Sequence, residues 1–299
     1  MLTRRKFLAA AGAATIGALA LEEYLIREPN HPELVQVEMP LSRLPAAFDG
    51  FRIVQLSDFH YDEIFCIHPI RRAVEMVNQI HPDLVVLTGD FVTVSMFADY
   101  VDHKEEAAWA ADPCAKLLSQ LQSRLGSLAC MGNHDIDSDP HRITQALESH
   151  GITMLRNASR SIEQGGSRLW ICGLDSTSGR PRIELALQGV PKDEPVIVLM
   201  HEPDFATVVK NYPVDLQLSG HSHGGQVWIP GIGAPWLPPG ARNFPRGRYT
   251  VGQLPLYTNI GLGTIRAPVR VNCTPEVTLV TLRAMGDHRT GISADILNC

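Results

Sequence analysis

The feature that most constrains this chain is a repeated pairing of an apolar run with a polar segment. Four apolar, strand-like runs, at residues 51–56, 84–87, 196–199 and 214–218, are each followed within three residues by side chains that can bind a metal. A fifth polar segment follows a shorter run at 128–131. Because binding residues gather outside the carboxyl ends of strands in open α/β sheets, these segments can converge in the fold. The pattern predicts an α/β protein with one polar site at the strand ends.

The five polar segments hold carboxylate, amide and imidazole side chains but no thiolate. The residues concerned are Asp58, His60, Asp90, Asn133, His134, Asp135, His201, His221 and His223. Any one segment alone is typical of a turn or a solvated loop. Together, oxygen and imidazole donors suit a pair of divalent Lewis-acid cations in a hydrolytic site.

The order of these motifs resembles the calcineurin-like metallophosphoesterases, from about residue 51 to about residue 282. The matching motifs are Asp-x-His, Gly-Asp, Gly-Asn-His-Asp, His and Gly-His-x-His. The later segments 261–264 and 275–279 are similar to a bacterial branch of exported, single-domain phosphodiesterases. The resemblance implies a four-layer sandwich in which two mixed β-sheets pack face to face with helices outside.

The resemblance also implies a role for each polar residue. Asp90 would bridge two metals, with Asp58, His60 and His223 completing one site and Asn133, His201 and His221 completing the other. His134 would be catalytic, stabilising developing charge or protonating the leaving alkoxide. Asp135 would orient the His134 imidazole, or it would be a structural residue that caps the next turn. Oxygen and imidazole ligands suit manganese, iron or zinc, and we expect manganese, since folding before export would favour a cytoplasmic metal.

The N-terminus predicts export. The segment Thr3-Arg4-Arg5-Lys6-Phe7-Leu8 precedes an Ala/Gly-rich apolar stretch that ends at Leu21, which is typical of a twin-arginine signal. The stretch is short for a membrane span, although an uncleaved signal could act as an anchor and a cytosolic helix is the remaining alternative. We therefore expect a signal at 1–21, a linker at 22–34, a catalytic domain at 35–285 and a tail at 286–299. The export machinery would be a partner, and the protein would be periplasmic or otherwise extracytoplasmic.

Composition excludes some classes of function. The chain has 299 residues, 44% of them hydrophobic, enough for one large domain or two small ones, and no boundary is evident within 35–285. A net charge of −6 gives no basic footprint for a nucleic acid. The six cysteines contain no Cys-x-x-Cys pair and are interpreted as buried free thiols, with one disulfide as the alternative in an oxidising compartment.

Local signals place several elements. Ile70, Val74, Val77 and Ile80 share one face of a helix that begins near Pro69. Asp112-Pro113 and Asp139-Pro140 each predict a helix start, Gly165-Gly166 predicts a hairpin turn, and 34–39 and 277–282 predict strands, the first at a sheet edge.

A long loop follows the last histidine motif, from Ile229 to Tyr249. It carries Trp236, Arg242 and Arg246, which we expect to bind substrate. Loops of this length are often functional, and a rigid structural wrap is the alternative. An apolar side chain beside arginines suits an amphiphilic phosphate ester, and the same groups could contact an anionic membrane surface.

These expectations converge on an exported dimetal phosphoesterase. Its substrates would be phosphodiesters or phosphomonoesters, including lipid or cell-envelope phosphates, attacked by a metal-activated hydroxide. The alternative is a catalytically quiet metal-binding scaffold with the same fold.

Overall fold

The computed structural model describes residues 12, 15, 17–19, 21–94 and 107–285. The twin-arginine motif at 3–8, the tail at 286–299 and Cys299 lie outside these residues. No helix within the described ranges has the length and apolarity needed to cross a membrane.

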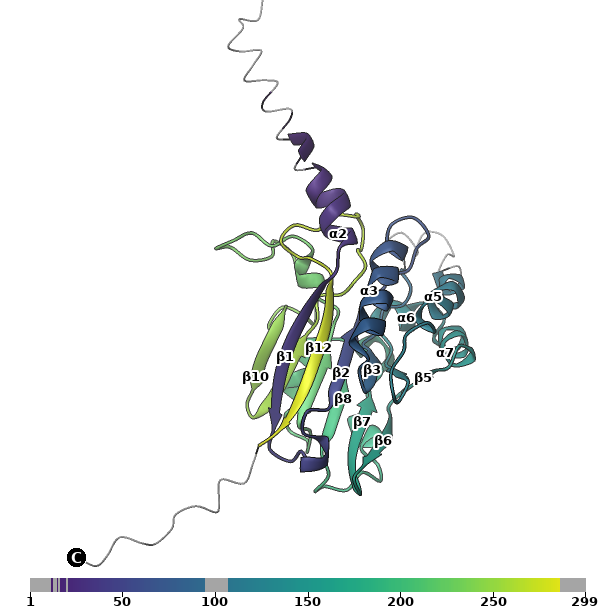
Figure 1. The fold of residues 1–299 in the computed structure, drawn as a ribbon, viewed down its shortest axis with the longest axis vertical. Coiled ribbons are helices and arrows are strands. Elements are labelled where there is room, and N and C mark those ends of the chain that lie inside the picture. Colours follow the sequence, from purple (N-terminus) through teal and green to yellow (C-terminus); the bar gives the residue numbers. More distant parts are fainter. Residues whose placement is uncertain (1–11, 13–14, 16, 20, 95–106, 286–299) are drawn as a thin grey trace, which may run out of the picture.

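Two six-stranded mixed sheets pack against each other (Figure 1). The strands of the first sheet, in spatial order, are β1 (Glu33–Leu41), β12 (Glu276–Ala284), β2 (Arg52–Leu56), β3 (Leu84–Leu87), β4 (Ser127–Ala129) and β5 (Ile152–Met154). Those of the second are β10 (Gly247–Val251), β11 (Leu254–Thr258), β9 (Leu216–Ser219), β8 (Val196–Leu199), β7 (Ser167–Gly173) and β6 (Ala158–Gln164). Strands β2 to β5 are mutually parallel, as are β7, β8, β9 and β11. The carboxyl ends of these strands therefore lie side by side at one end of each sheet.

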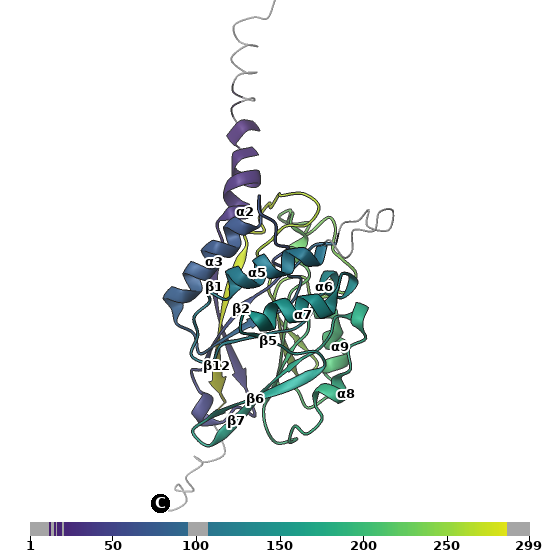
Figure 2. The same ribbon diagram turned by 90° about the vertical axis from the view of Figure 1, so that its right-hand side faces the viewer.

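Helices cover the outer faces of both sheets. Against the first sheet lie α3 (Ile67–Ile80), α5 (Ala111–Leu118) and α7 (Pro140–Ser149), which Figure 2 shows in front of the strands. Against the second lie α8 (Ile183–Ala186) and α9 (Ala206–Val209). The shorter helical elements are η1 (Glu23–Arg27), α2 (Glu28–Asn30), η2 (Ala46–Phe48), η3 (Ala108–Ala110), α6 (Asn133–Asp137), η4 (Thr177–Gly179), η5 (Pro203–Phe205) and η6 (His223–Gly225).

Three apolar cores hold the layers together. One lies between the sheets and contains Ile53 and Val86 from the first sheet and Ile197 from the second. The other two lie between each sheet and its helices, so Val54 packs under the first helical layer while Ile53 faces the other sheet. The four-layer sandwich expected from the resemblance is confirmed.

Several local predictions are confirmed. Helix α3 buries Ile70, Val74 and Val77 on one face. The Asp139 carboxylate accepts hydrogen bonds from the backbone of His141 and Arg142 and so caps α7. The glycine pair at 165–166 turns β6 into β7, and β1 lies at the edge of the first sheet.

Two local expectations differ from the structure. Asp112 does not cap α5, because that helix follows η3 directly and begins at Ala111. Asp112 Oδ1 lies instead 3.2 Å from His150 Nε2. Residues 22–34, expected as a linker, contain η1, α2 and the first two residues of β1. The Glu28 carboxylate accepts the Cys273 amide at 2.6 Å, which fastens this segment to the body of the fold.

Candidate metal centre

The polar segments converge at the carboxyl ends of strands from both sheets. Asp58 and His60 follow β2, and Asp90 follows β3. The residues after β4, β8 and β9 complete the set with Asn133, His134, Asp135, His201, His221 and His223. Backbone bonds join the loops, since the Asp58 amide donates to Gly89 O and the His60 amide to Asp90 O, both at 3.0 Å.

The first group of candidate ligands consists of Asp58, His60 and His223, all buried. His60 Nε2 lies 3.0 Å from His223 Nε2, and His223 Nε2 lies 3.3 Å from Asp58 Oδ1. Three donor atoms this close share the space that one cation would fill, since a metal bound to nitrogen and oxygen at about 2.0–2.2 Å holds its ligands roughly 3 Å apart.

The second group consists of Asp90, His201 and His221, also buried. Asp90 Oδ2 lies 3.0 Å from His201 Nε2 and 3.6 Å from His60 Nε2. The Asp90 carboxylate therefore stands between the two groups, in the place that a bridging ligand requires.

Hydrogen bonds orient the imidazoles. His201 Nδ1 donates to the Thr88 carbonyl at 2.6 Å, and His221 Nε2 donates to the Pro239 carbonyl at 2.9 Å. Each bond fixes the proton on one ring nitrogen, so the other nitrogen is the one available to a metal, as is usual for metal-binding histidines. His60 Nδ1 lies 3.0 Å from Thr93 Oγ1, which holds that ring in a similar way.

The donor set fits divalent cations. Asn133 Oδ1 is buried and has no hydrogen-bond partner among the described residues. A buried polar atom without a partner is costly, and a cation would satisfy the amide oxygen of Asn133, whose neighbour His134 bonds Asp90 through its backbone amide. We therefore regard Asn133, with its neutral oxygen, as a further candidate ligand.

The electrostatics of the cluster agree with this arrangement. Burial holds the pKa of His60 well below its usual value although Asp90 opposes the shift, and burial together with the Arg270 guanidinium does the same to the pKa of His223. Burial opposes the charged forms of Asp90 and His201, but their mutual attraction prevails, so the pKa of Asp90 lies well below its usual range and that of His201 well above. The neutral imidazoles of His60 and His223 and the ionised carboxylate of Asp90 are forms that bind metals, whereas His201, paired with Asp90, would give up a proton to a metal that binds there.

Backbone strain is concentrated at the same residues. Asp58, His60, Asp90, His221 and His223 all have positive φ, between 43° and 70°. Such conformations cost residues other than glycine about 1–3 kcal/mol each and gather at functional sites. Five candidate ligands in this conformation indicate that their positions are set by function.

His134 and Asp135 do not contact each other in the way first expected. The Val94 amide donates to His134 Nδ1 at 2.9 Å, which leaves the ring proton on Nε2. The Asp135 carboxylate accepts the backbone amides of Asp90, Phe91 and Gly132, each at 2.8 Å. Burial, followed by the charge of Asp90, raises the pKa of Asp135 to about 7. These contacts are those of the structural alternative, in which Asp135 holds the backbone around Asp90.

The long loop borders the cluster, since its Pro239 carbonyl accepts from His221, and its three expected substrate residues each contact a different partner. Trp236 is half exposed and lies under Arg266, whose guanidinium is 4.4 Å from the ring centre. Arg246 stacks on Trp228 instead, and the backbone amide of Arg242 donates to Asp204. Sequence patterns gave no signal for Arg266, which lies outside the motifs and reaches the site through tertiary packing.

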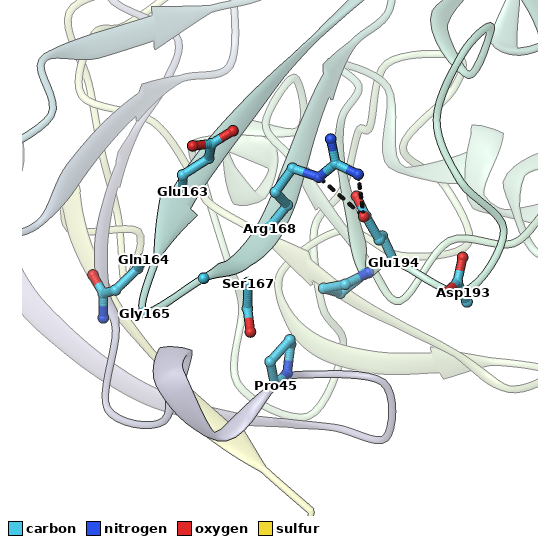
Figure 3. Close-up of a pocket in the computed structure, with 10 residues that line it drawn as sticks. Pro45, Glu163, Gln164, Gly165, Ser167, Arg168, Asp193 and Glu194 are labelled. Atoms are coloured by element: carbon cyan, nitrogen blue, oxygen red, sulfur yellow. Dashed lines mark hydrogen bonds and ion pairs between the residues drawn. The ribbon is translucent and has the colours of Figure 1, made fainter.

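A separate cavity of about 600 Å³ lies at the turn between β6 and β7 (Figure 3). Figure 3 shows the paired side chains of Arg168 and Glu194, which come from the start of β7 and the residues just before β8. This cavity is at the amino ends of those strands, whereas the candidate ligands follow the carboxyl ends.

Comparison with known proteins then identifies the family. A family model described as calcineurin-like phosphoesterase matches residues 51–225, which is more than half of the chain. The chain belongs to this family. The matched region contains every candidate metal ligand, and the enzyme class follows from the membership: the chain is a metal-dependent phosphoric ester hydrolase, as the motifs indicate.

Three relatives are similar over most of their length. The chain is 35% identical over 293 residues to the uncharacterized metallophosphoesterase YkuE of Bacillus subtilis, covering 95% of this chain and 98% of that protein. It is 31% identical over 288 residues to the phosphodiesterase YaeI of Escherichia coli, covering 94% and 100%. It is 26% identical over 312 aligned positions to the UDP-2,3-diacylglucosamine pyrophosphatase LpxG of Chlamydia muridarum, covering 85% and 90%.

Proposed function

We propose that this calcineurin-like phosphoesterase is an exported phosphodiesterase that acts on amphiphilic phosphates of the cell envelope. The observation that carries the hydrolytic part is the position of the Asp90 carboxylate between the Asp58–His60–His223 group and the His201–His221 pair. Two divalent cations held there would lower the pKa of bound water and neutralise charge on the phosphoryl oxygens. Manganese is the metal we expect, with iron or zinc as alternatives.

Individual residues of the chain would each have a separate role in the hydrolysis. Asp90 joins the two groups of ligands, and Asn133 adds an oxygen without adding charge, which keeps the centre electrophilic. His134 carries its proton on Nε2 because Nδ1 accepts the Val94 amide, so this ring can donate a proton or a hydrogen bond to the oxygen of the leaving alcohol. The ring centres of His134 and His60 lie 5.0 Å apart, which places this donor beside the candidate ligands.

The substrate class is supported by relatives and by the surface around the site. One relative bears the name of a phosphodiesterase and another that of a pyrophosphatase acting on a diacylated nucleotide sugar. Exposed apolar side chains occur on the segment after the first metal motif, where Ile64 and Phe65 are 69% and 50% exposed, and on the long loop, where Ile232 is 78% exposed. Apolar side chains around a phosphate-processing site suit a lipid phosphate better than a small soluble ester.

Hydrolysis of bis-p-nitrophenyl phosphate with added manganese tests the proposal. His134→Ala should keep its metals yet lose about 10²–10⁴-fold in turnover, the range for a positioned acid or base. The loss should be larger for alkyl leaving groups than for p-nitrophenol, which leaves without needing a proton. His68→Ala, on the exposed face of α3, is the matched control and should behave as wild type. A wild-type protein that binds two metals but hydrolyses neither diesters nor monoesters would be the quiet scaffold instead.

Export is a separate part of the proposal, supported by the sequence of residues 3–8. Replacing Arg4 and Arg5 by lysine should leave the protein in the cytoplasm, because the twin-arginine pathway reads that pair. Fractionation of cells that express the double variant and the wild type measures the difference. Undiminished export of the variant would show that Arg4 and Arg5 are not the export signal, and it would leave the hydrolytic proposal unaffected.

A further inference from the structure

A second cavity, of about 390 Å³, opens directly beside the metal cluster. His60 and Thr93 belong to its wall, so it reaches the first group of candidate ligands. Its other walls come from the segment after the first metal motif, from Ala107 and Ala110 at η3, and from the loop before β12. A substituent of a phosphate bound at the metals could therefore enter this space.

The lining of this cavity is mainly apolar. The apolar lining residues are Tyr61, Phe65, Ala107, Ala110, Ala267 and Pro268. Its one carboxylate, on Asp62, accepts the backbone amides of Ile64, Phe65 and Cys66 at 2.6–3.0 Å, so its charge is offset locally and serves to shape the loop. The remaining charged side chain of the lining is that of Arg266.

Arg266 is held in place by the structure around it. Its φ of 68° is a conformation that side-chain-bearing residues rarely adopt. The guanidinium stacks on Trp236 at 4.4 Å from the ring centre. Gln226 fastens the loop on both sides of Arg266, because its Oε1 accepts the Ile265 amide at 2.5 Å and its Nε2 donates to Ala267 O at 3.3 Å.

This anchoring connects Arg266 to the metal ligands. Gln226 comes directly after η6, which contains His223, so one short segment carries both a candidate ligand and the residue that fixes the arginine loop. Stacking on Trp236 orders the guanidinium before any ligand arrives, which lowers the entropy cost of binding an anion. An arginine that is already ordered at the edge of an apolar cavity can bind the charged group of an amphiphilic anion while the cavity holds its apolar part.

The apolar surface continues beyond the cavity. Phe65 and Pro268 also line a neighbouring groove with Leu25 and Pro29, which belong to the N-terminal helical segment. Figure 1 shows that segment rising from the same end of the molecule as the loops before β12. An apolar chain that leaves the metal centre past Phe65 therefore meets further apolar side chains.

We propose that this cavity binds the apolar substituent of a phosphate ester, and that Arg266 binds a second anionic group carried by the same substrate. The inference rests on the proposed function and specifies its substrate: an amphiphile with one scissile phosphate and one further negative charge. Arginine suits this task because its planar, permanently charged fork binds carboxylate and phosphate oxygens in pairs.

A matched pair of p-nitrophenyl phosphodiesters tests the role of Arg266. Both carry the same alkyl chain, which ends in a carboxylate in one and in an amide in the other, so they differ by one charge. Wild type should prefer the carboxylate. Arg266→Ala should raise KM for the carboxylate about tenfold, the loss expected for a hydrogen bond to a charged group, with kcat, the amide substrate and bis-p-nitrophenyl phosphate little changed. Arg160→Ala, an exposed arginine on β6, is the control and should show no such loss.

A second variant tests the apolar wall independently. Phe65→Ser should reduce the preference for a decyl over an ethyl p-nitrophenyl phosphodiester, while hydrolysis of the ethyl ester continues. Equal effects of Arg266→Ala on the carboxylate and amide substrates, or an unchanged chain-length preference in Phe65→Ser, would overturn the inference while the phosphodiesterase function stands. Failure of the wild type to hydrolyse every one of these esters would instead remove the proposed function itself.

Discussion

Replacing Gly132 by alanine should displace the Asp90 carboxylate, the proposed bridging ligand, without straining the local backbone. Gly132 has φ −93° and ψ 179°, a conformation that alanine adopts freely. A Cβ at this position would lie 2.1 Å from Asp90 Oδ1, 2.4 Å from Asp90 N and 2.7 Å from Asp90 Cγ. Non-bonded heavy atoms rest at about 3.5–4.0 Å, so Asp90 must move by roughly 1 Å or more.

The size of the effect follows from that displacement. Metal sites tolerate about 0.2 Å of error in ligand distance, and a misplacement of about 1 Å at a reacting centre can cost about 10²-fold in rate. Overpacking adds about 1–3 kcal/mol of destabilisation. Gly132→Ala should therefore lose metal and at least about 100-fold in turnover while remaining folded.

Gly151→Ala is the matched control. A Cβ there would have no atom within 4 Å, but the φ of 80° makes alanine unfavourable, by about 1–2 kcal/mol. The control should thus be destabilised to a similar degree and still bind metal and hydrolyse bis-p-nitrophenyl phosphate. Elemental analysis, turnover and thermal unfolding are measured on both variants. Full metal content and activity in Gly132→Ala would refute the placement of Asp90 beside Gly132.

The remaining predictions concern Asp135 and the cysteines. Asp135→Asn places an amide donor among the backbone donors of Asp90 and Gly132, so it should lower the free energy of unfolding in urea by about 1–3 kcal/mol and reduce metal content. Unchanged stability and metal content would show that these bonds are dispensable. Burial raises the pKa of both Cys66 and Cys172 to about 12, so iodoacetamide at pH 8 should leave the two thiols unmodified in the native protein and label them in urea. Rapid labelling of either thiol in the native state, read by peptide mass spectrometry, would contradict their burial.

The fold and the ligand cluster could be predicted because each depends on a local pattern with one geometric consequence. The apolar runs at 84–87 and 196–199 became β3 and β8, and the polar residues after them met at the strand ends as the α/β rule requires. The five described cysteines are free and buried, which confirms for these five the interpretation as buried free thiols.

Contacts made between distant segments could not be predicted in the same way. The Asp112-Pro113 signal for a helix start was overridden by η3, which extends the helical region upstream. Thr93 and Val94 hold His60 and His134 through bonds that span 33 and 40 residues, and no spacing rule specifies such partners. Arg266 is a further example. Its stacking on Trp236 joins the loop before β12 to the loop at 229–249, and no local sequence pattern specifies that contact.

The contacts of Asp135 show how this site maintains its strained ligands. Asp90 is held at a φ of 57°, a conformation that its own local preferences disfavour. Its amide is bonded to the Asp135 carboxylate, its Oδ1 accepts the His134 amide at 2.9 Å, and its carbonyl accepts the His60 amide. These bonds join three loops, so the protein's own hydrogen bonds hold Asp90 in place. Asp135 therefore fixes the loop that carries Asp90, which explains why a buried carboxylate follows His134 without touching its ring.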